Sequence, residues 1–128
     1  MSEIKIKLEA NLKTVGQLTG KTSLVNTAFN EPRQEMNPGE LVANALGACM
    51  LTMVGFLALR RGENVEGTEV TVVPSFDDKH TRITSFAVTF TFPAHLSQMQ
   101  KDFYAKAAEA CPVHNSLRED MTYKIVVK

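Results

Sequence analysis

The start of the chain alternates apolar and polar side chains with a period of two. Residues 4–9 read I-K-I-K-L-E, and this alternation is typical of a half-buried β-strand with its apolar face turned inward. Weaker strand patterns follow at 15–18 and 22–25, separated by glycines and polar residues that favour tight turns. We therefore predict a small antiparallel sheet of three strands. On the covered face of its first strand we expect Ile4, Ile6 and Leu8.

A long uncharged segment follows a polar loop rich in turn-forming residues. No residue from 41 to 59 carries a charge. Asn37 is a suitable N-cap before this segment, Pro38 suits the first helical position, and Gly62 suits the end of a helix. Together these signals predict one helix over residues 38–61.

This apolar helix allows two interpretations. Its nineteen uncharged residues, at a rise of about 1.5 Å each, approach the thickness of a bilayer core, so a membrane-spanning segment is one of them. We favour the other, a buried helix of a soluble protein, because Asn44 and Thr52 interrupt the apolar run and the flanking patterns indicate a soluble sheet. A smooth strip of small residues would let a second helix approach closely, which favours a homodimer. The strip consists of Ala43, Gly47 and Gly55.

Strand patterns return after this helix. Residues 69–74 and 82–92 are predicted strands, and Asp77 and Asp78 lie in the turn between them. The second of these strands has large apolar side chains at every other position, which places them on one face. This face consists of Phe86, Val88, Phe90 and Phe92.

Two helices and a strand complete the pattern. A helix is predicted over 97–110, followed by a short helix over 113–120 and a strand over 122–127. The resulting order of elements predicts an α+β fold with mainly antiparallel pairing. The apolar residues near helical spacing in the first of these helices are Met99, Phe103 and Ala107.

The composition fits one soluble domain that spans residues 1–128. Fourteen Lys and Arg balance fourteen Asp and Glu, so no net field attracts nucleic acid or an anionic membrane. The first ten residues lack the continuous apolar core of a secretory signal peptide. We therefore expect a cytoplasmic protein with no nucleic-acid or membrane partner.

Two cysteines are the main candidates for chemistry, and they lie 62 positions apart. In a reducing compartment such cysteines are more often reactive, metal-binding or buried than joined in a permanent disulfide. Cys49 falls on an apolar stripe of the long helix, so a buried structural cysteine is the plainer hypothesis. Burial raises the pKa of a thiol, and a reactive Cys49 would need a cationic or hydrogen-bonding neighbour. The stripe consists of Val42, Ala45, Leu46, Thr52, Met53 and Phe56.

Cys111 lies between two predicted helices and directly before Pro112, which suits the first position of the second helix. A thiol there has unpaired N–H groups and the positive end of a helix dipole nearby, and both favour the thiolate. The alternative is a junction residue without chemistry. Zinc is a further hypothesis, but the chain has no C-x-x-C pair and His114 is the only imidazole close by. We expect no metal and no other cofactor, and we interpret His114 as a helix-surface residue or a histidine satisfied by hydrogen bonds.

Two segments resemble the signatures of one known family. Residues 37–49 read N-P-G-E-L-V-A-N-A-L-G-A-C, and residues 111–117 read C-P-V-H-N-S-L. Both are similar to segments of the OsmC/Ohr family, the osmotically inducible and organic hydroperoxide resistance proteins, and they occur in the same order. The resemblance implies an OsmC/Ohr-like α+β fold, with antiparallel sheets around a long buried central helix, and an intertwined homodimer.

The same resemblance implies a thiol-dependent peroxidase that acts on organic hydroperoxides. Cys49 would attack the peroxide oxygen and become a sulfenic acid, and Cys111 would condense with it to a disulfide that an external dithiol reduces. The apolar stripe beside Cys49 suits an alkyl or fatty-acid hydroperoxide better than hydrogen peroxide. The second hypothesis is an OsmC-like protein that binds an apolar ligand, or serves in redox stress, without efficient turnover.

The chain departs from the family's pattern at two supporting positions. The family's best-known peroxidases place a glutamate ten residues before the first cysteine, where this chain has Gly39 and carries Glu40 one position later. Glu40 cannot reach the thiol along a straight helix but can orient an arginine; its alternative role is to stabilise the helix start. Arg33 is the only arginine before Cys49 and matches the family's N-terminal arginine by region. The alternative for Arg33 is an exposed loop charge.

Overall fold

The computed structural model describes residues 3–18, 24–29 and 33–128. The chain divides into an N-terminal unit, Met1–Leu41, and a C-terminal unit, Val42–Lys128. Part of the strand predicted at 22–25 lies outside the described residues.

The N-terminal unit contains a three-stranded antiparallel sheet. Its strands are β1 (Ile4–Leu8), β2 (Thr14–Leu18) and β3 (Leu24–Thr27), in the order β1-β2-β3. A short 3-10 turn, η1 (Ala10–Leu12), joins the first two strands. The antiparallel sheet predicted from the alternating pattern is therefore confirmed.

The burial predicted for β1 is wrong. All five of its residues are exposed. A period of two places alternate side chains on one side of a strand, but it does not determine whether another layer covers that side. The exposed fractions of the three side chains expected to face inward are 60%, 63% and 69%, for Ile4, Ile6 and Leu8.

The long apolar segment forms a single helix, α1 (Pro38–Arg61), as predicted. Its start is a reciprocal cap, in which the N–H of Glu40 donates to Asn37 Oδ1 and the N–H of Asn37 donates to Glu40 Oε1, each at 2.9 Å. Its end is set by Gly62, which adopts the left-handed backbone conformation at φ 66°. Both ends of the helix are therefore explained by local sequence signals.

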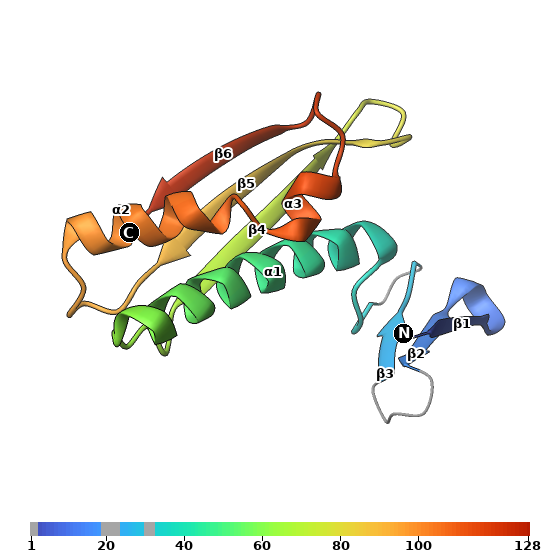
Figure 1. The fold of residues 1–128 in the computed structure, drawn as a ribbon. Helices are drawn as coiled ribbons and strands as arrows, with labels where there is room; N and C mark the ends of the chain where they lie inside the picture. Colours follow the sequence, from blue (N-terminus) through green and yellow to red (C-terminus); the bar gives the residue numbers. More distant parts are fainter. Residues whose placement is uncertain (1–2, 19–23, 30–32) are drawn as a thin grey trace. The chain divides into compact units, whose positions relative to one another are not determined.

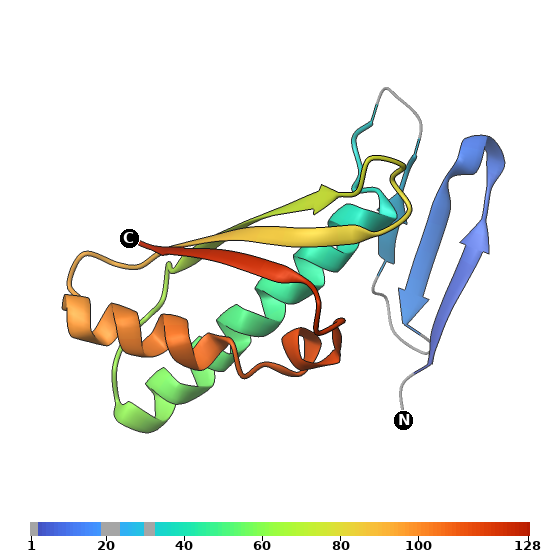
Figure 2. The ribbon, with the colours of Figure 1, turned by 90° about the horizontal axis from the view of Figure 1, so that it is seen from above.

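The C-terminal unit is a three-stranded sheet with helices on one face, as Figures 1 and 2 show. Its strands β4 (Glu69–Phe76), β5 (Ile83–Thr91) and β6 (Thr122–Val127) follow the order β4-β5-β6. β4 and β5 form an antiparallel hairpin, whereas β5 and β6 are parallel. The parallel pair is joined through two helices, α2 (Gln98–Ala108) and α3 (Pro112–Ser116). The prediction of an α+β fold with mainly antiparallel pairing is confirmed.

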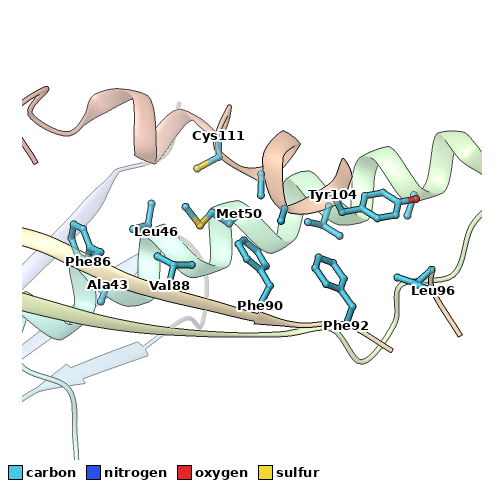
Figure 3. Close-up of a cluster of buried hydrophobic side chains, with 14 residues drawn as sticks. Ala43, Leu46, Met50, Phe86, Val88, Phe90, Phe92, Leu96, Tyr104 and Cys111 are labelled. Atoms are coloured by element: carbon cyan, nitrogen blue, oxygen red, sulfur yellow. The ribbon is translucent and has the colours of Figure 1, made fainter. Parts of the chain in front are cut away.

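The hydrophobic core lies between this sheet and the helices (Figure 3). The alternate residues predicted on one face of β5 and just beyond it are all buried, at 6% exposure or less. They contact a stripe on α1 whose members recur three or four residues apart, as expected for one covered side of a helix. The buried residues of α1 are Ala43, Leu46, Gly47, Met50, Val54 and Ala58.

Within the single chain α1 is covered on one side, and the burial of its other side by a partner copy stays a prediction. Phe56 and Leu59 are 62% and 80% exposed. Nor is the small-residue strip continuous: a Cβ at Gly47 would lie 3.1 Å from Val70 of β4, whereas nothing lies within 4 Å of one at Gly55. Gly47 therefore lets α1 approach its own sheet closely.

Among the described residues, α1 is also the one helix long and apolar enough to cross a membrane, judged by length and composition. Core helices of soluble proteins meet the same criteria. Since α1 packs one side against β4 and β5, the contacts within the chain support the core-helix interpretation.

The apolar residues at helical spacing in α2 are not the residues that this helix buries. Met99 is 82% exposed and Phe103 is 41% exposed. The helix instead buries Tyr104, Ala105 and Ala108. Its N-terminus follows local rules closely, because Ser97 and Gln100 form a second reciprocal cap.

Candidate functional site

Cys49 lies on α1 at the border between the covered and exposed sides of the helix. It is partly exposed, and it packs against the core that contains the fully buried Leu46 and Met50. The apolar stripe predicted around Cys49 is thus only partly covered, because Ala45, Thr52 and Phe56 of that stripe are exposed. The thiol therefore has apolar neighbours and a route to the surface of this unit, which a reactive cysteine requires.

Cys111 is fully buried at the junction between α2 and α3. It is the N-cap of α3, and its sulfur accepts a hydrogen bond from the backbone N–H of His114 at 3.4 Å. Figure 3 shows its side chain directed towards α1, on the side of Leu46 and Met50. The placement predicted for Cys111, at the start of a helix that Pro112 opens, is confirmed.

The fold brings the two cysteines together. Cys49 interacts with the side chain of Cys111, and both belong to the same apolar cluster of the C-terminal unit. Both thiols are free. Two residues remote in the sequence thus become neighbours because α1 and the α2–α3 junction cover the same face of the β4-β5-β6 sheet.

The protonation state expected of Cys111 from its place at a helix start needs correction. Burial raises the pKa of the Cys111 thiol, and the neighbouring Cys49 raises it further. The backbone N–H groups of His114 and Val113 lower the same pKa but do not offset the burial. At neutral pH Cys111 is therefore a protonated thiol, because a helix start of one turn does not replace the lost solvent.

Two residues that interact with Cys111, His114 through its backbone and Tyr123 through charge, have aromatic rings in contact with each other. The ring centroids of His114 and Tyr123 are 4.5 Å apart. Tyr123 also stacks on Phe86, with 5.8 Å between the ring centroids. Phe86 and Tyr123 also pair in the register of β5 and β6. Burial raises the pKa of Tyr123, and the negative charge that Cys111 can carry raises it further, so these two acidic groups lie within electrostatic reach.

Arg33 and Glu40 form an ion pair within the N-terminal unit. Arg33 donates to both carboxylate oxygens of Glu40, and the Nη2–Oε2 distance is 3.3 Å. Hydrogen bonds from Arg33 and from the backbone of Asn37 lower the pKa of Glu40. Glu40 thus both caps α1 and holds an arginine, so the two roles weighed for it occur together. The placement of Arg33 and Glu40 in the active site stays a prediction.

Metal binding was a further hypothesis for the cysteines. In the described part of the chain, no three His, Cys, Asp or Glu residues are arranged to hold a metal ion.

Two residues of this site were not recognised from the sequence. His114 is partly exposed, as a helix-surface residue would be, but its Nδ1 is buried and has no hydrogen-bond partner among the described residues. Tyr123 was not singled out from the sequence. The period of two in β6 could have identified Tyr123, because its side chain shares the covered face with Ile125 and Val127. Nothing in the local sequence indicates that Tyr123 lies close to Cys111.

Solved structures of similar fold cover nearly the whole chain. A protein of Psychrobacter arcticus 273-4, named for an osmotic stress induced and detoxification response, superposes with a TM-score of 0.90 at 22% identity, over 98% of this chain and 95% of that one. An OsmC-like protein of Mycoplasma pneumoniae gives 0.85 at 14% identity, over 100% and 96%. An organic hydroperoxide resistance protein of Legionella pneumophila gives 0.76 at 18% identity, over 98% and 95%.

These likenesses confirm the predicted OsmC/Ohr-like fold. No curated protein matches the sequence. The model of one protein family, described as OsmC-like protein, matches residues 30–126, which include both cysteines and both recognised motifs. This match covers most of the sequence. The chain therefore belongs to the OsmC-like protein family.

Proposed function

We propose that this protein is a thiol-dependent peroxidase that reduces organic hydroperoxides. Cys49 is the attacking cysteine and Cys111 the resolving cysteine. One observation supports this assignment most strongly: two free thiols, 62 positions apart in the chain, are neighbours in one apolar cluster. The difference in exposure fits the two roles, since the attacking thiol must meet a substrate and the resolving thiol must meet only its partner.

The reaction has three steps. The Cys49 thiolate attacks the terminal peroxide oxygen, so that an S–O bond forms, the O–O bond breaks, and the alkoxide takes up a proton and leaves as an alcohol. Cys111 then attacks the sulfur of the Cys49 sulfenic acid, which releases water and forms a disulfide. An external dithiol reduces this disulfide with two electrons and is itself oxidised to a disulfide.

Arg33 and Glu40 take supporting roles in this proposal. Arg33 supplies the cation that stabilises the Cys49 thiolate and the charge on the departing oxygen, and Glu40 orients its guanidinium. The ion pair supports this view, because a guanidinium held through two nitrogens is fixed in direction as well as in place. The family's peroxidases carry a glutamate at the position of Gly39, and this chain has Glu40 one position later. The pairing of Glu40 with Arg33 is therefore the feature to test.

The class of substrate follows from the apolar surroundings of Cys49. Ala45 and Met53, one helical turn to either side of Cys49, are exposed or partly exposed, and they offer apolar surface that an alkyl hydroperoxide can cover and hydrogen peroxide cannot. We further propose that the protein acts as a homodimer in the cytoplasm, where dithiol reductants maintain free thiols. The large exposed side chains of Phe56 and Leu59 on α1 support a partner copy, because soluble monomers rarely leave apolar patches uncovered.

Peroxide consumption in the presence of dithiothreitol tests the proposal. We expect the protein to consume tert-butyl hydroperoxide faster than hydrogen peroxide, and Cys49→Ser to lower the rate by about a thousandfold or more. Cys111→Ser should still react with one equivalent of peroxide but form no intramolecular disulfide. Equal rates for the unsubstituted protein and Cys49→Ser would favour the second hypothesis, an apolar-ligand-binding protein without turnover.

A further inference from the structure

Two buried polar atoms near Cys111 have no hydrogen-bond partner among the described residues. They are Nδ1 of His114 and the hydroxyl oxygen of Tyr123. Leaving a polar atom buried without a partner costs about 1–3 kcal/mol, so such atoms call for an explanation. The two rings that carry these atoms are in contact, with centroids 4.5 Å apart, and Tyr123 packs against the apolar cluster that contains Cys111.

Both residues interact with Cys111, Tyr123 through charge and His114 through its backbone. The backbone N–H of His114 donates to Cys111 Sγ, which ties α3 to the thiol. Tyr123 is held from the other side by Phe86, whose ring is nearly parallel to its own at an angle of 18°. Both residues are therefore held by their neighbours, while His114 Nδ1 and the Tyr123 hydroxyl take no part in the hydrogen bonds of the described residues.

The chemistry at Cys111 creates a need for such groups. Its thiol is fully buried and protonated, so it must release a proton before its sulfur can attack. Solvent does not reach this sulfur, and the rest of the cluster around it is apolar. A proton acceptor has to come from a polar side chain close by, and a developing negative charge on sulfur needs a hydrogen-bond donor.

We propose that His114 and Tyr123 form a proton-transfer pair for Cys111, in which His114 Nδ1 takes up the thiol proton and the Tyr123 hydroxyl donates a hydrogen bond to the sulfur. This inference rests on the proposed function. The electron pair of the Cys111 sulfur forms the S–S bond as the S–O bond of the Cys49 sulfenic acid breaks. The departing hydroxide takes the proton from the imidazolium, so sulfenic acid and thiol become disulfide and water.

A single-turnover experiment separates this step from the reaction with peroxide. The reduced protein is mixed with one equivalent of tert-butyl hydroperoxide, and samples are quenched over time with dimedone, which traps sulfenic acid, before mass spectrometry. The variants are Tyr123→Phe, which keeps the ring, and His114→Ala. Matched controls are Tyr104→Phe, a buried tyrosine hydroxyl bound to Glu63 instead, and His95→Ala, an exposed histidine.

We expect the Cys49 sulfenic acid to form at the same rate in all five proteins. Disulfide closure should slow by about a hundredfold in His114→Ala and by about tenfold in Tyr123→Phe, so that the dimedone adduct accumulates. Added imidazole should restore closure in His114→Ala but not in Tyr123→Phe, a result that a purely structural role for the histidine would not produce. His114→Asn serves as a second variant if His114→Ala does not fold, and it should close slowly as well.

Two outcomes overturn different claims. Closure at the unsubstituted rate in Tyr123→Phe and in a folded His114 variant, or an equal slowing in the two controls, would refute the proton-transfer pair and leave the peroxidase intact. If the unsubstituted protein forms neither the dimedone adduct nor the disulfide, the proposed function itself is wrong.

Discussion

Tyr104 of α2 donates its hydroxyl hydrogen to the carboxylate of Glu63, the second residue after α1. The same carboxylate accepts hydrogen bonds from Arg61 at 2.8 Å and from Gln100 at 2.5 Å. Arg61 in turn lies over the ring of Phe103, 4.5 Å from its centroid. This cluster joins the end of α1 to α2, and it satisfies the hydroxyl of a tyrosine that is otherwise fully buried.

The first prediction concerns the pH dependence of stability. Hydrogen bonds from Tyr104, Arg61 and Gln100 lower the pKa of Glu63 from 4.5 to about 2. A carboxyl group whose pKa is lower in the folded state stabilises that state above its unfolded pKa. This contribution is fully present above about pH 4.5 and is lost as the pH falls towards 2. Glu63→Gln should therefore lower the free energy of unfolding at pH 7 and make its decline in acid shallower.

Urea unfolding at a series of pH values measures this effect. Glu66→Gln is the matched control, because Glu66 lies three positions further on and is exposed. Equal changes in the pH dependence of the unfolding free energy for Glu63→Gln and Glu66→Gln would contradict the role of Glu63 in this cluster.

The second prediction concerns the start of α1. Asn37→Ala removes the side-chain oxygen that accepts from the N–H of Glu40, and it should lower the free energy of unfolding by about 1 kcal/mol. Glu40→Gln keeps an oxygen for the N–H of Asn37 but removes the charge that pairs with Arg33. We therefore expect Glu40→Gln to destabilise less than Asn37→Ala but to slow peroxide consumption more. Urea unfolding and the peroxidase assay, run on both variants, check this reversal of order.

The third prediction concerns the proposed homodimer. Phe56 and Leu59 are large, exposed and close together on α1. If a partner copy covers them, the double substitution to serine should convert a dimer to a monomer, as measured by size-exclusion chromatography with light scattering at micromolar concentration. Met99→Ser on α2, also strongly exposed, is the control that should leave the dimer intact. A monomer in the unsubstituted protein, or a protein that needs detergent to stay in solution, would contradict the proposed assembly.

Local signals in the sequence predicted the elements of this fold closely. Asn37 and Gly62 determine the ends of α1 through hydrogen bonds and backbone conformation that depend on neighbouring residues only. The alternation around Phe86, Val88 and Phe90 likewise identified a face of β5 that proved to be buried. These predictions succeed because the physics that decides them acts within a few residues.

What covers each face could not be predicted in the same way. Ile6 of β1 and Met99 of α2 follow the expected periods, yet both are exposed in the chain. The periodicity of a sequence indicates which side chains lie on the same face of a strand or helix. Whether that face is buried depends on elements far away in the sequence. The parallel pairing of β6 with β5 is a long-range feature of the same kind.

The candidate site was predicted in part. The family resemblance identified Cys49 and Cys111, and folding places them together. The helix-start argument for a Cys111 thiolate failed because burial, which no local pattern reports, outweighs two backbone N–H groups. Tyr123 was missed for the same reason, since its neighbour across the core is 12 positions earlier in the chain and on another element.

The most direct test of the central claim is the mass of the intact protein after one equivalent of an organic hydroperoxide, without added reductant. The account predicts a loss of two hydrogens per chain, with peptide mapping that joins the fragments containing Cys49 and Cys111. Both thiols remaining free, or oxygen accumulating on one cysteine while the other stays reduced in the unsubstituted protein, would contradict it.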